Sequence, residues 1–222
     1  MTEQTRYPIG SPGQAWGETE RAQWRARQVR RRVYADDVLQ PVAALAGAFE
    51  CTQYGVIGQG ADTYPLMALR TPHWDATLPW ALVTGGVHGY ETSGVLGALQ
   101  FLQERAAAYA GRINLLVVPC VNPWGYERIQ RWNAEAIDPN RAFRPNSPAA
   151  ESAALMQLVT TVTGTTLLHI DLHETTDSDE TEFRPALAAR DGVPFVPGSI
   201  PDGFYLVCLL YTSDAADDTP CV

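Results

Sequence analysis

Short apolar runs and amphipathic stretches alternate through the middle of the chain, and this alternation restricts the possible folds more than any other feature. Three apolar runs, at residues 80–84, 113–118 and 165–172, have the length of buried strands. Two stretches with a helical pattern, residues 91–109 and 149–161, separate them. The order strand, helix, strand, helix, strand predicts an α/β fold, a three-layer α/β/α sandwich with a mixed, largely parallel central sheet.

The residues before this core supply further elements. We expect an extended arm at 1–16, an Arg-rich helix at 18–34, a second helix at 36–49 and a β-hairpin at 51–70. The hairpin is indicated by Gly58-Gln59-Gly60, a turn-forming sequence between two apolar runs. The chain length suits one domain, which we place at residues 1–206, with 1–36 as its N-terminal arm and helix.

The end of the chain differs in character from the rest. Residues 207–222 include the string Tyr-Thr-Ser-Asp-Ala-Ala-Asp-Asp, which resembles a translated sequencing adapter. We therefore expect residues 207–222 to be a non-native tail. The domain would then be incomplete at its C-terminus, and we expect weak or no activity from the chain as it stands.

Charge and apolar content narrow the classes of function. Acidic residues outnumber basic ones by 25 to 16, whereas nucleic-acid-binding proteins usually carry a basic face. No apolar run approaches the roughly 20 residues that span a bilayer, and the first residues lack an apolar leader. The four cysteines form no C-x-x-C pair, which suits reduced thiols. We expect a cytoplasmic protein with no nucleic-acid and no membrane partner.

A histidine and a glutamate follow the first predicted strand. Gly85-Gly86 ends that strand, and His88 and Glu91 come directly afterwards. At a turn made sharp by glycine, this spacing can bring an imidazole nitrogen and a carboxylate onto one cation. The alternative is a surface pair at a helix start, where glutamate also favours the helix dipole. The position favours a metal site, because ligands bind beyond the carboxyl ends of parallel strands.

A second group of titratable residues ends the third predicted strand. Side chains alternate along a strand, so His169, Asp171 and His173 share one face. His173 lies nearest the carboxyl end and is the better ligand, whereas we expect His169 to be a core histidine and Asp171 to orient a ligand. His88, Glu91 and His173 make two histidines and one carboxylate, the donor set of a catalytic zinc site. Non-haem iron accepts the same set, but the short H-x-x-E spacing favours zinc.

The long segment between the second strand and the next helix carries five polar residues that suit an active site: Arg128, Arg131, Asp138, Asn140 and Arg141. Long loops in compact domains usually have a function. Arginine can bind a carboxylate through two parallel hydrogen bonds or stabilise a developing oxyanion. Solvated surface arginines are the alternative, and the position between two candidate ligand segments favours the site.

Four motifs occur in the order H-x-x-E, N-P-x-G-Y, D-x-N-R and D-L-H. They read His88-Gly89-Tyr90-Glu91, Asn122-Pro123-Trp124-Gly125-Tyr126, Asp138-Pro139-Asn140-Arg141 and Asp171-Leu172-His173. This order resembles the zinc metallocarboxypeptidases of the carboxypeptidase A type over roughly residues 64–206. The related aspartoacylase/succinylglutamate desuccinylase branch shares the core of the pattern. Each motif alone is weak, but four in this order are specific.

The resemblance implies a metal centre with named ligands. His88, Glu91 and His173 would bind zinc, with one ion per chain. Asp138 would hydrogen-bond the ligand His88. Asp171 would orient a ligand without binding the metal itself.

The resemblance also implies roles toward the substrate. Arg131 would polarise the scissile carbonyl, with Arg128 as its nearest rival for that role. Asn140 and Arg141 would bind the free carboxylate of the substrate.

The chain departs from the family pattern in places. Ala142 stands where the family usually has asparagine, and Glu174 stands where the peptidases usually have serine. The general-base glutamate and the capping tyrosine of the family lie on a late segment and have no counterpart that we can place here. Glu174 and Glu182 are the nearest stand-ins for the base, and no motif supports them.

The function implied is hydrolysis of an amide bond beside a free carboxylate, with a metallocarboxypeptidase acting on peptides as the first hypothesis. The first alternative is a deacylase with the same zinc centre that acts on N-acyl amino acids. The second is a non-catalytic member that binds a metal, a carbohydrate or a peptide. An assay of N-acyl amino acids against peptides separates the two enzymes.

Overall fold

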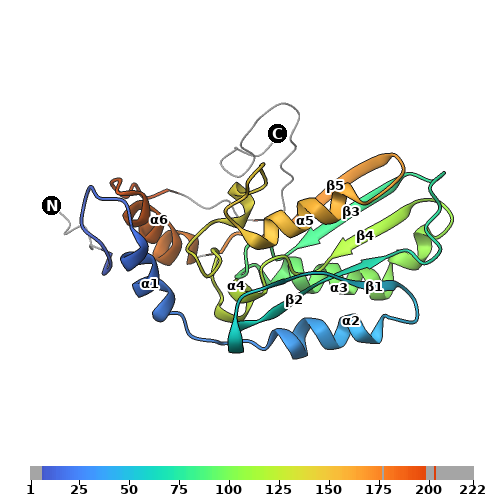
Figure 1. Ribbon diagram of the computed structural model, residues 1–222, viewed down its shortest axis with the longest axis horizontal. Coiled ribbons are helices and arrows are strands. Elements are labelled where there is room, and N and C mark those ends of the chain that lie inside the picture. The colour runs from blue at the N-terminus through green and yellow to red at the C-terminus, as the bar shows by residue number, and fades with distance from the viewer. Residues whose placement is uncertain (1–6, 177, 199–202, 204–222) are drawn as a thin grey trace.

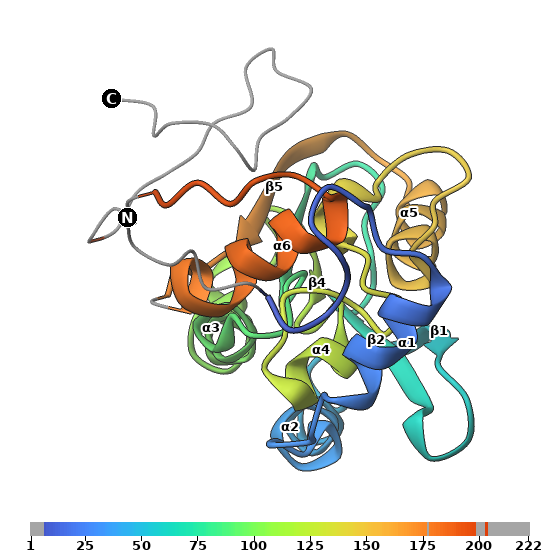
Figure 2. The ribbon, with the colours of Figure 1, turned by 90° about the vertical axis from the view of Figure 1, so that its left-hand side faces the viewer.

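The computed structural model describes residues 7–176, 178–198 and 203, so the predicted tail at 207–222 lies outside the described residues. Within this part of the chain, five strands form one mixed sheet with helices on both faces (Figure 1, Figure 2). None of the helices there is long and apolar enough to cross a bilayer.

The sheet is partly rather than largely parallel. Its strands are β1 (Glu50–Ile57), β2 (Tyr64–Arg70), β3 (Trp80–Gly85), β4 (Asn114–Val118) and β5 (Thr166–Leu172), in the spatial order β1-β2-β4-β3-β5. β3 pairs in parallel with β4 and β5, whereas β2 is antiparallel to β1 and β4. The predicted β1–β2 hairpin forms, and its short connection requires the two strands to run antiparallel.

Helices lie on both faces of this sheet and beside one end of it (Figure 1). They are α1 (Glu18–Ala26), α2 (Gln40–Ala44), α3 (Thr92–Glu104), α4 (Pro123–Arg128), α5 (Ala150–Thr160) and α6 (Arg184–Asp191). Val95 of α3 shares one buried apolar cluster with Val83, and Leu155 of α5 shares the other with Leu82. Because neighbouring residues of β3 point to opposite faces, α3 and α5 cover opposite faces, as Figure 2 shows.

The Arg-rich helix is shorter than predicted. The predicted segment was 18–34, and α1 ends at Ala26. The backbone amides of Arg31 and Arg32 instead donate to the carbonyl of Glu127, at N–O distances of 2.7 and 3.1 Å. This contact with a distant part of the chain replaces the helical hydrogen bonds and turns the segment toward α4.

The carboxyl ends of three strands meet at one edge of the sheet. The parallel register pairs Gly85 of β3 with Leu172 of β5, and Thr84 of β3 with Val118 of β4. Gly86 then turns the chain at a φ of +61°, which favours glycine. The residues that follow β3 and β5 are therefore brought together at this edge.

Candidate metal centre

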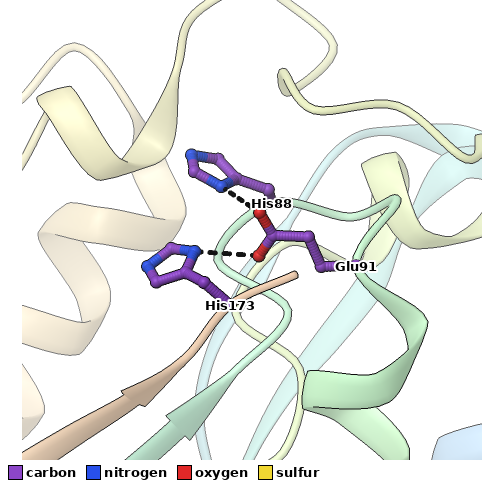
Figure 3. Close-up of side chains that lie close together, drawn as sticks. All are labelled: His88, Glu91 and His173. Carbon is purple, nitrogen blue, oxygen red and sulfur yellow. Dashed lines mark hydrogen bonds and ion pairs between the residues drawn. The ribbon is translucent and has the colours of Figure 1, made fainter. Parts of the chain in front are cut away.

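Two histidines converge on one carboxylate at this edge. His88 and Glu91 lie in the turn between β3 and α3, and His173 directly follows β5. His88 Nδ1 lies 2.7 Å from Glu91 Oε1, and His173 Nδ1 lies 2.8 Å from Glu91 Oε2 (Figure 3). One ligand atom from each residue lies within 4.8 Å of the others, so the three can hold one metal ion.

The cluster is closed on one side and open on the other. His88 and Glu91 are buried, with 2% and 1% of their surface exposed. The His173 side chain is 36% exposed. A catalytic metal needs protein ligands together with a position open to water and substrate, and this arrangement provides both.

The outer nitrogen of each imidazole is held by a second carboxylate. His88 Nε2 lies 3.0 Å from Asp138 Oδ1, and His173 Nε2 lies 2.8 Å from Asp171 Oδ2. This pairing leaves both Nδ1 atoms facing Glu91, the third candidate ligand. Metal-binding histidines almost always donate their other N–H to such a group. Two imidazole nitrogens and one carboxylate, each imidazole supported in this way, fit a zinc ion.

The electrostatics of the cluster also suit a cation. Burial alone would lower the pKa of His173, but hydrogen bonds to Asp171 and Glu91 outweigh it and raise the pKa to about 10. Burial alone would raise the pKa of Glu91, but His88 and His173 lower it. The carboxylates thus favour positive charge between them, which imidazolium protons or a metal ion can supply.

The charge count points to a divalent ion. The carboxylates of Glu91, Asp138 and Asp171 contact the two imidazoles, and one guanidinium, that of Arg131, pairs with Asp138. With both imidazoles neutral, two negative charges remain uncompensated among these groups. Buried charge is costly without a partner, so a doubly charged cation would balance the cluster.

Arg131 contacts the cluster through Asp138. Its Nε donates to Asp138 Oδ2 at 3.0 Å, and its Nη1 donates to the Tyr90 hydroxyl at 3.2 Å. Asn140 and Arg141 lie on the short 3-10 turn that follows Asp138, and the Asn140 backbone amide donates to Asp138 Oδ1 at 2.9 Å. The structure therefore places Arg131 and the Asn140 backbone against Asp138, the carboxylate that contacts the candidate ligand His88, with Arg141 on the same turn.

Arg128 lies in a different network. Its Nη2 donates to both carboxylate oxygens of Asp62 at 2.9 Å, and its Nη1 donates to the Tyr64 hydroxyl. Its guanidinium carbon lies 4.6 Å from the centre of the Trp124 ring. None of these contacts involves the metal cluster. The structure thus provides no support for Arg128 as a rival to Arg131, and ties it to the β1–β2 connection instead.

The predicted stand-ins for a general base are placed differently from one another. Glu174 Oε2 accepts hydrogen bonds from the Ser93 amide at 2.9 Å and the Ser93 hydroxyl at 2.8 Å. It therefore stabilises the first turn of α3, where amides lack helical partners. Glu182 is exposed and lines a separate cavity of about 780 Å³.

That cavity lies next to the cluster. Its lining includes Tyr90 and Arg131, together with the aromatic side chains of Trp24 and Phe183. Among the described residues, the three candidate metal ligands do not line it. Tyr90 and Arg131 therefore form part of the wall between the cavity and the metal cluster.

Histidine 169 is not the core residue that we predicted. Its side chain is hydrogen-bonded, with Nε2 2.8 Å from the Thr84 hydroxyl, but the residue is exposed. The reason is that β5 pairs with β3 on one side and has no partner strand on the other within the described residues. Thr84 also donates to Asp171 Oδ1 at 2.6 Å, so it supports the carboxylate behind His173.

Three residues of this network were not predicted from the sequence, namely Thr84, Tyr90 and Asp179. Tyr90 lies inside the H-x-x-E motif, and its burial at 6% exposure gives it a fixed position there. Its position between two candidate ligands in the motif could have identified it from the sequence. Asp179 lies in an acidic run that resembles exposed surface, and nothing in the sequence singles it out.

Comparison with known proteins identifies a related family. Residues 77–190, just over half of the chain, match the family described as the succinylglutamate desuccinylase/aspartoacylase catalytic domain. The matched region contains the whole cluster. No curated protein matches the chain.

Three solved structures have a similar fold. A proposed metallopeptidase from Shewanella denitrificans is 24% identical, with a TM-score of 0.52 over 77% of this chain and 61% of that one. A proposed carboxypeptidase A from the same species is 21% identical, with a TM-score of 0.53 over 62% and 38%. A metallo-carboxypeptidase from Burkholderia cenocepacia is 19% identical, with a TM-score of 0.50 over 64% and 40%. The chain spans less than two thirds of the length of each.

Proposed function

Because the chain belongs to the succinylglutamate desuccinylase/aspartoacylase family, we propose that it is a zinc-dependent hydrolase that cleaves an amide bond beside a free carboxylate. Our first candidate is a metallocarboxypeptidase acting on peptides. The four motifs in carboxypeptidase order support this choice. We extend the proposal to the architecture, a three-layer α/β/α domain over residues 1–206.

One observation carries the proposal. His88, Glu91 and His173 direct two imidazole nitrogens and a carboxylate at one point, and Asp138 and Asp171 hold the outer nitrogens. A structural hydrogen-bond cluster would not need both imidazoles oriented in this way by separate carboxylates. Metal-binding histidines almost always have it.

The residues around the cluster support a hydrolytic role. A zinc ion held by His88, Glu91 and His173 would acidify a water molecule and polarise the scissile carbonyl. Arg131 lies behind Asp138 with no hydrogen bond from Nη2 to the described residues, which leaves a donor for a developing oxyanion. Asn140 and Arg141 would bind the free carboxylate of the substrate, and the planar guanidinium suits that group.

No residue of the described chain is assigned as general base. The Glu174 carboxylate accepts two hydrogen bonds from Ser93, and Glu182 lines the neighbouring cavity rather than the cluster. A base must reach the proton that it takes by hydrogen-bond distance or through one water molecule. The proposed function therefore rests on the metal centre and on the arginines.

A deacylase acting on N-acyl amino acids is the second candidate. The family match favours it directly, because the matched family is named for succinylglutamate desuccinylase and aspartoacylase. Both candidates use the same metal centre and a substrate with a free carboxylate. They differ in the group on the far side of the amide bond.

A paired substrate panel tests the proposal. The zinc-loaded chain is incubated with N-acyl amino acids and with peptides that end in the same amino acids, and released amino acid is measured. Because we expect the domain to be incomplete, any hydrolysis should be weak and confined to one class. It should be lost in Glu91→Gln and weakened in Arg141→Ala, with Arg105→Ala as an exposed control. Hydrolysis that survives Glu91→Gln in a folded protein would refute the proposal.

A further inference from the structure

The Tyr90 hydroxyl connects two charged side chains that are far apart in the sequence. It donates a hydrogen bond to Asp179 Oδ1 at 2.7 Å and accepts one from Arg131 Nη1 at 3.2 Å. Tyr90 and Asp179 are 6% and 7% exposed, so water has little access to this contact. The hydroxyl proton is committed to the carboxylate, and the lone pairs are left to receive the guanidinium.

Arg131 is held from several directions at once. Asp138 accepts from its Nε, Tyr90 accepts from its Nη1, and the Asp179 carboxylate lies 3.9 Å from Nη1. The guanidinium carbon also lies 4.7 Å from the centre of the Phe183 ring, a cation–π contact. A flexible arginine side chain is thereby restricted to one orientation.

The contact continues from Arg131 to the metal ligands. Arg131 Nε holds Asp138 Oδ2, and the other oxygen of Asp138 holds His88 Nε2 at 3.0 Å. An unbroken series of hydrogen bonds thus leads from Asp179 through Tyr90, Arg131 and Asp138 to His88. Asp179 itself is fixed by the Thr176 amide, which donates to its Oδ2 at 2.9 Å.

We propose that Tyr90 and Asp179 are positioning residues for Arg131, which they hold in the orientation that engages Asp138 and leaves Nη2 for the substrate. This inference rests on the proposed function for its catalytic meaning, but the contact itself exists without substrate. The two residues act only through Arg131 and touch no reacting atom. A purely structural role predicts a different response to mutation, and this makes the inference testable.

The direct test measures the Arg131 Nε–H group by ¹⁵N–¹H NMR on the purified full chain, with its signal assigned from its loss in Arg131→Lys. In Tyr90→Phe we expect exchange of this proton with water to become about tenfold faster, because the guanidinium loses one anchor. Asp179→Asn should have a similar but smaller effect, since an amide oxygen can still accept from Tyr90. Unchanged exchange in both folded variants would overturn the inference.

Tyr34→Phe provides a matched control. Tyr34 is a buried tyrosine whose hydroxyl donates to the Pro65 carbonyl at 2.9 Å, in a part of the protein without metal ligands. Like Tyr90→Phe, the Tyr34→Phe substitution removes a hydroxyl oxygen from a buried side chain. The Arg131 signal should not change in this variant, and an equal change in both variants would indicate general loosening.

A double-mutant cycle tests the link with catalysis. In the native background Tyr90→Phe should lower kcat about tenfold with little change in KM, because an oxyanion contact acts mainly in the transition state. In an Arg131→Ala background the same substitution should have no further effect. Equal losses in both backgrounds would refute action through Arg131. If the native chain neither binds zinc nor hydrolyses either substrate class, the proposed function fails, and the exchange measurement still decides the positioning role.

Discussion

Glu91 and His173 are 82 positions apart in the sequence, yet His173 Nδ1 lies 2.8 Å from Glu91 Oε2. The parallel pairing of β3 with β5 brings them together, because the two strands end side by side at Gly85 and Leu172. His88 completes the cluster from the same turn as Glu91. The candidate metal centre therefore depends on the register of the sheet.

The carboxylates behind the histidines should tune metal affinity. Replacing Asp138 or Asp171 with asparagine removes the charge that holds an imidazole Nε2, and we expect zinc affinity to fall about 10- to 100-fold. Competition with a chromogenic chelator measures this. Asp62→Asn, in the separate Arg128 network, should leave the affinity unchanged. Native affinity in both Asp138→Asn and Asp171→Asn would argue against metal ligation by these histidines.

The motif glycine Gly89 should not tolerate a side chain. A Cβ atom there would lie 2.0 Å from the carbonyl carbon of Gly125, and backbone cannot move aside cheaply. We expect Gly89→Ala to lower the free energy of unfolding by about 3 kcal/mol or more. Urea denaturation provides the measurement.

A second glycine offers the matched control. In α3, a Cβ at Gly97 would meet only Leu172 Cδ1 at 4.0 Å, so Gly97→Ala should stabilise the helix by about 0.5–1 kcal/mol. If both substitutions gave the same change, close packing at Gly89 could not be the cause.

The buried carboxyl of Glu151 on α5 should make stability depend on pH. Burial raises its pKa from 4.5 to about 7, despite hydrogen bonds that lower it. The folded state thus binds this proton more tightly than the unfolded state. Protonation of Glu151 therefore adds most to the free energy of unfolding below pH 4.5. This contribution is lost as the pH rises toward 7.

Glu151→Gln should remove this dependence. At pH 8 we expect the variant to be more stable than the native chain, by up to about 3 kcal/mol, and the difference should shrink toward pH 4.5. Urea denaturation of both proteins across this range measures it. A difference that is constant with pH would show that Glu151 titrates normally.

The free edge of β5 should promote self-association. Leu168 and Ile170 are 41% and 47% exposed on this strand, which has no partner on its outer side among the described residues. Unpaired edges with apolar side chains tend to pair with other chains. Leu168→Lys should lower the weight-average mass in sedimentation experiments. Val29→Lys, an exposed apolar residue outside any strand, should leave it unchanged.

Local sequence patterns were enough to predict the core of the site. Alternation along β5 placed Asp171 and His173 on one face, and the structure shows them hydrogen-bonded to each other. The glycine turn after β3 placed His88 and Glu91 at the same edge of the sheet. These predictions succeeded because strand periodicity and parallel register are short-range rules that determine where strand ends lie.

The contacts that we did not predict join residues that are distant in the sequence. We expected Arg128 in a long loop, but it ends α4, which begins at Pro123 and is capped by Asn122, whose side chain accepts a hydrogen bond from the Gly125 amide. Its guanidinium then pairs with Asp62, 66 positions away. Tyr90 and Asp179 are 89 positions apart. Local patterns do not reveal which polar side chains meet across such separations, because the packing of whole elements decides it.

The zinc content of the purified chain, measured by elemental analysis beside His88→Ala and His173→Ala, tests the proposed metal centre most directly. Circular dichroism confirms that each variant is folded. We expect about one zinc ion per native chain and little in either variant, since each removes one of three candidate protein ligands. A folded His173→Ala protein that keeps its full metal content would contradict it.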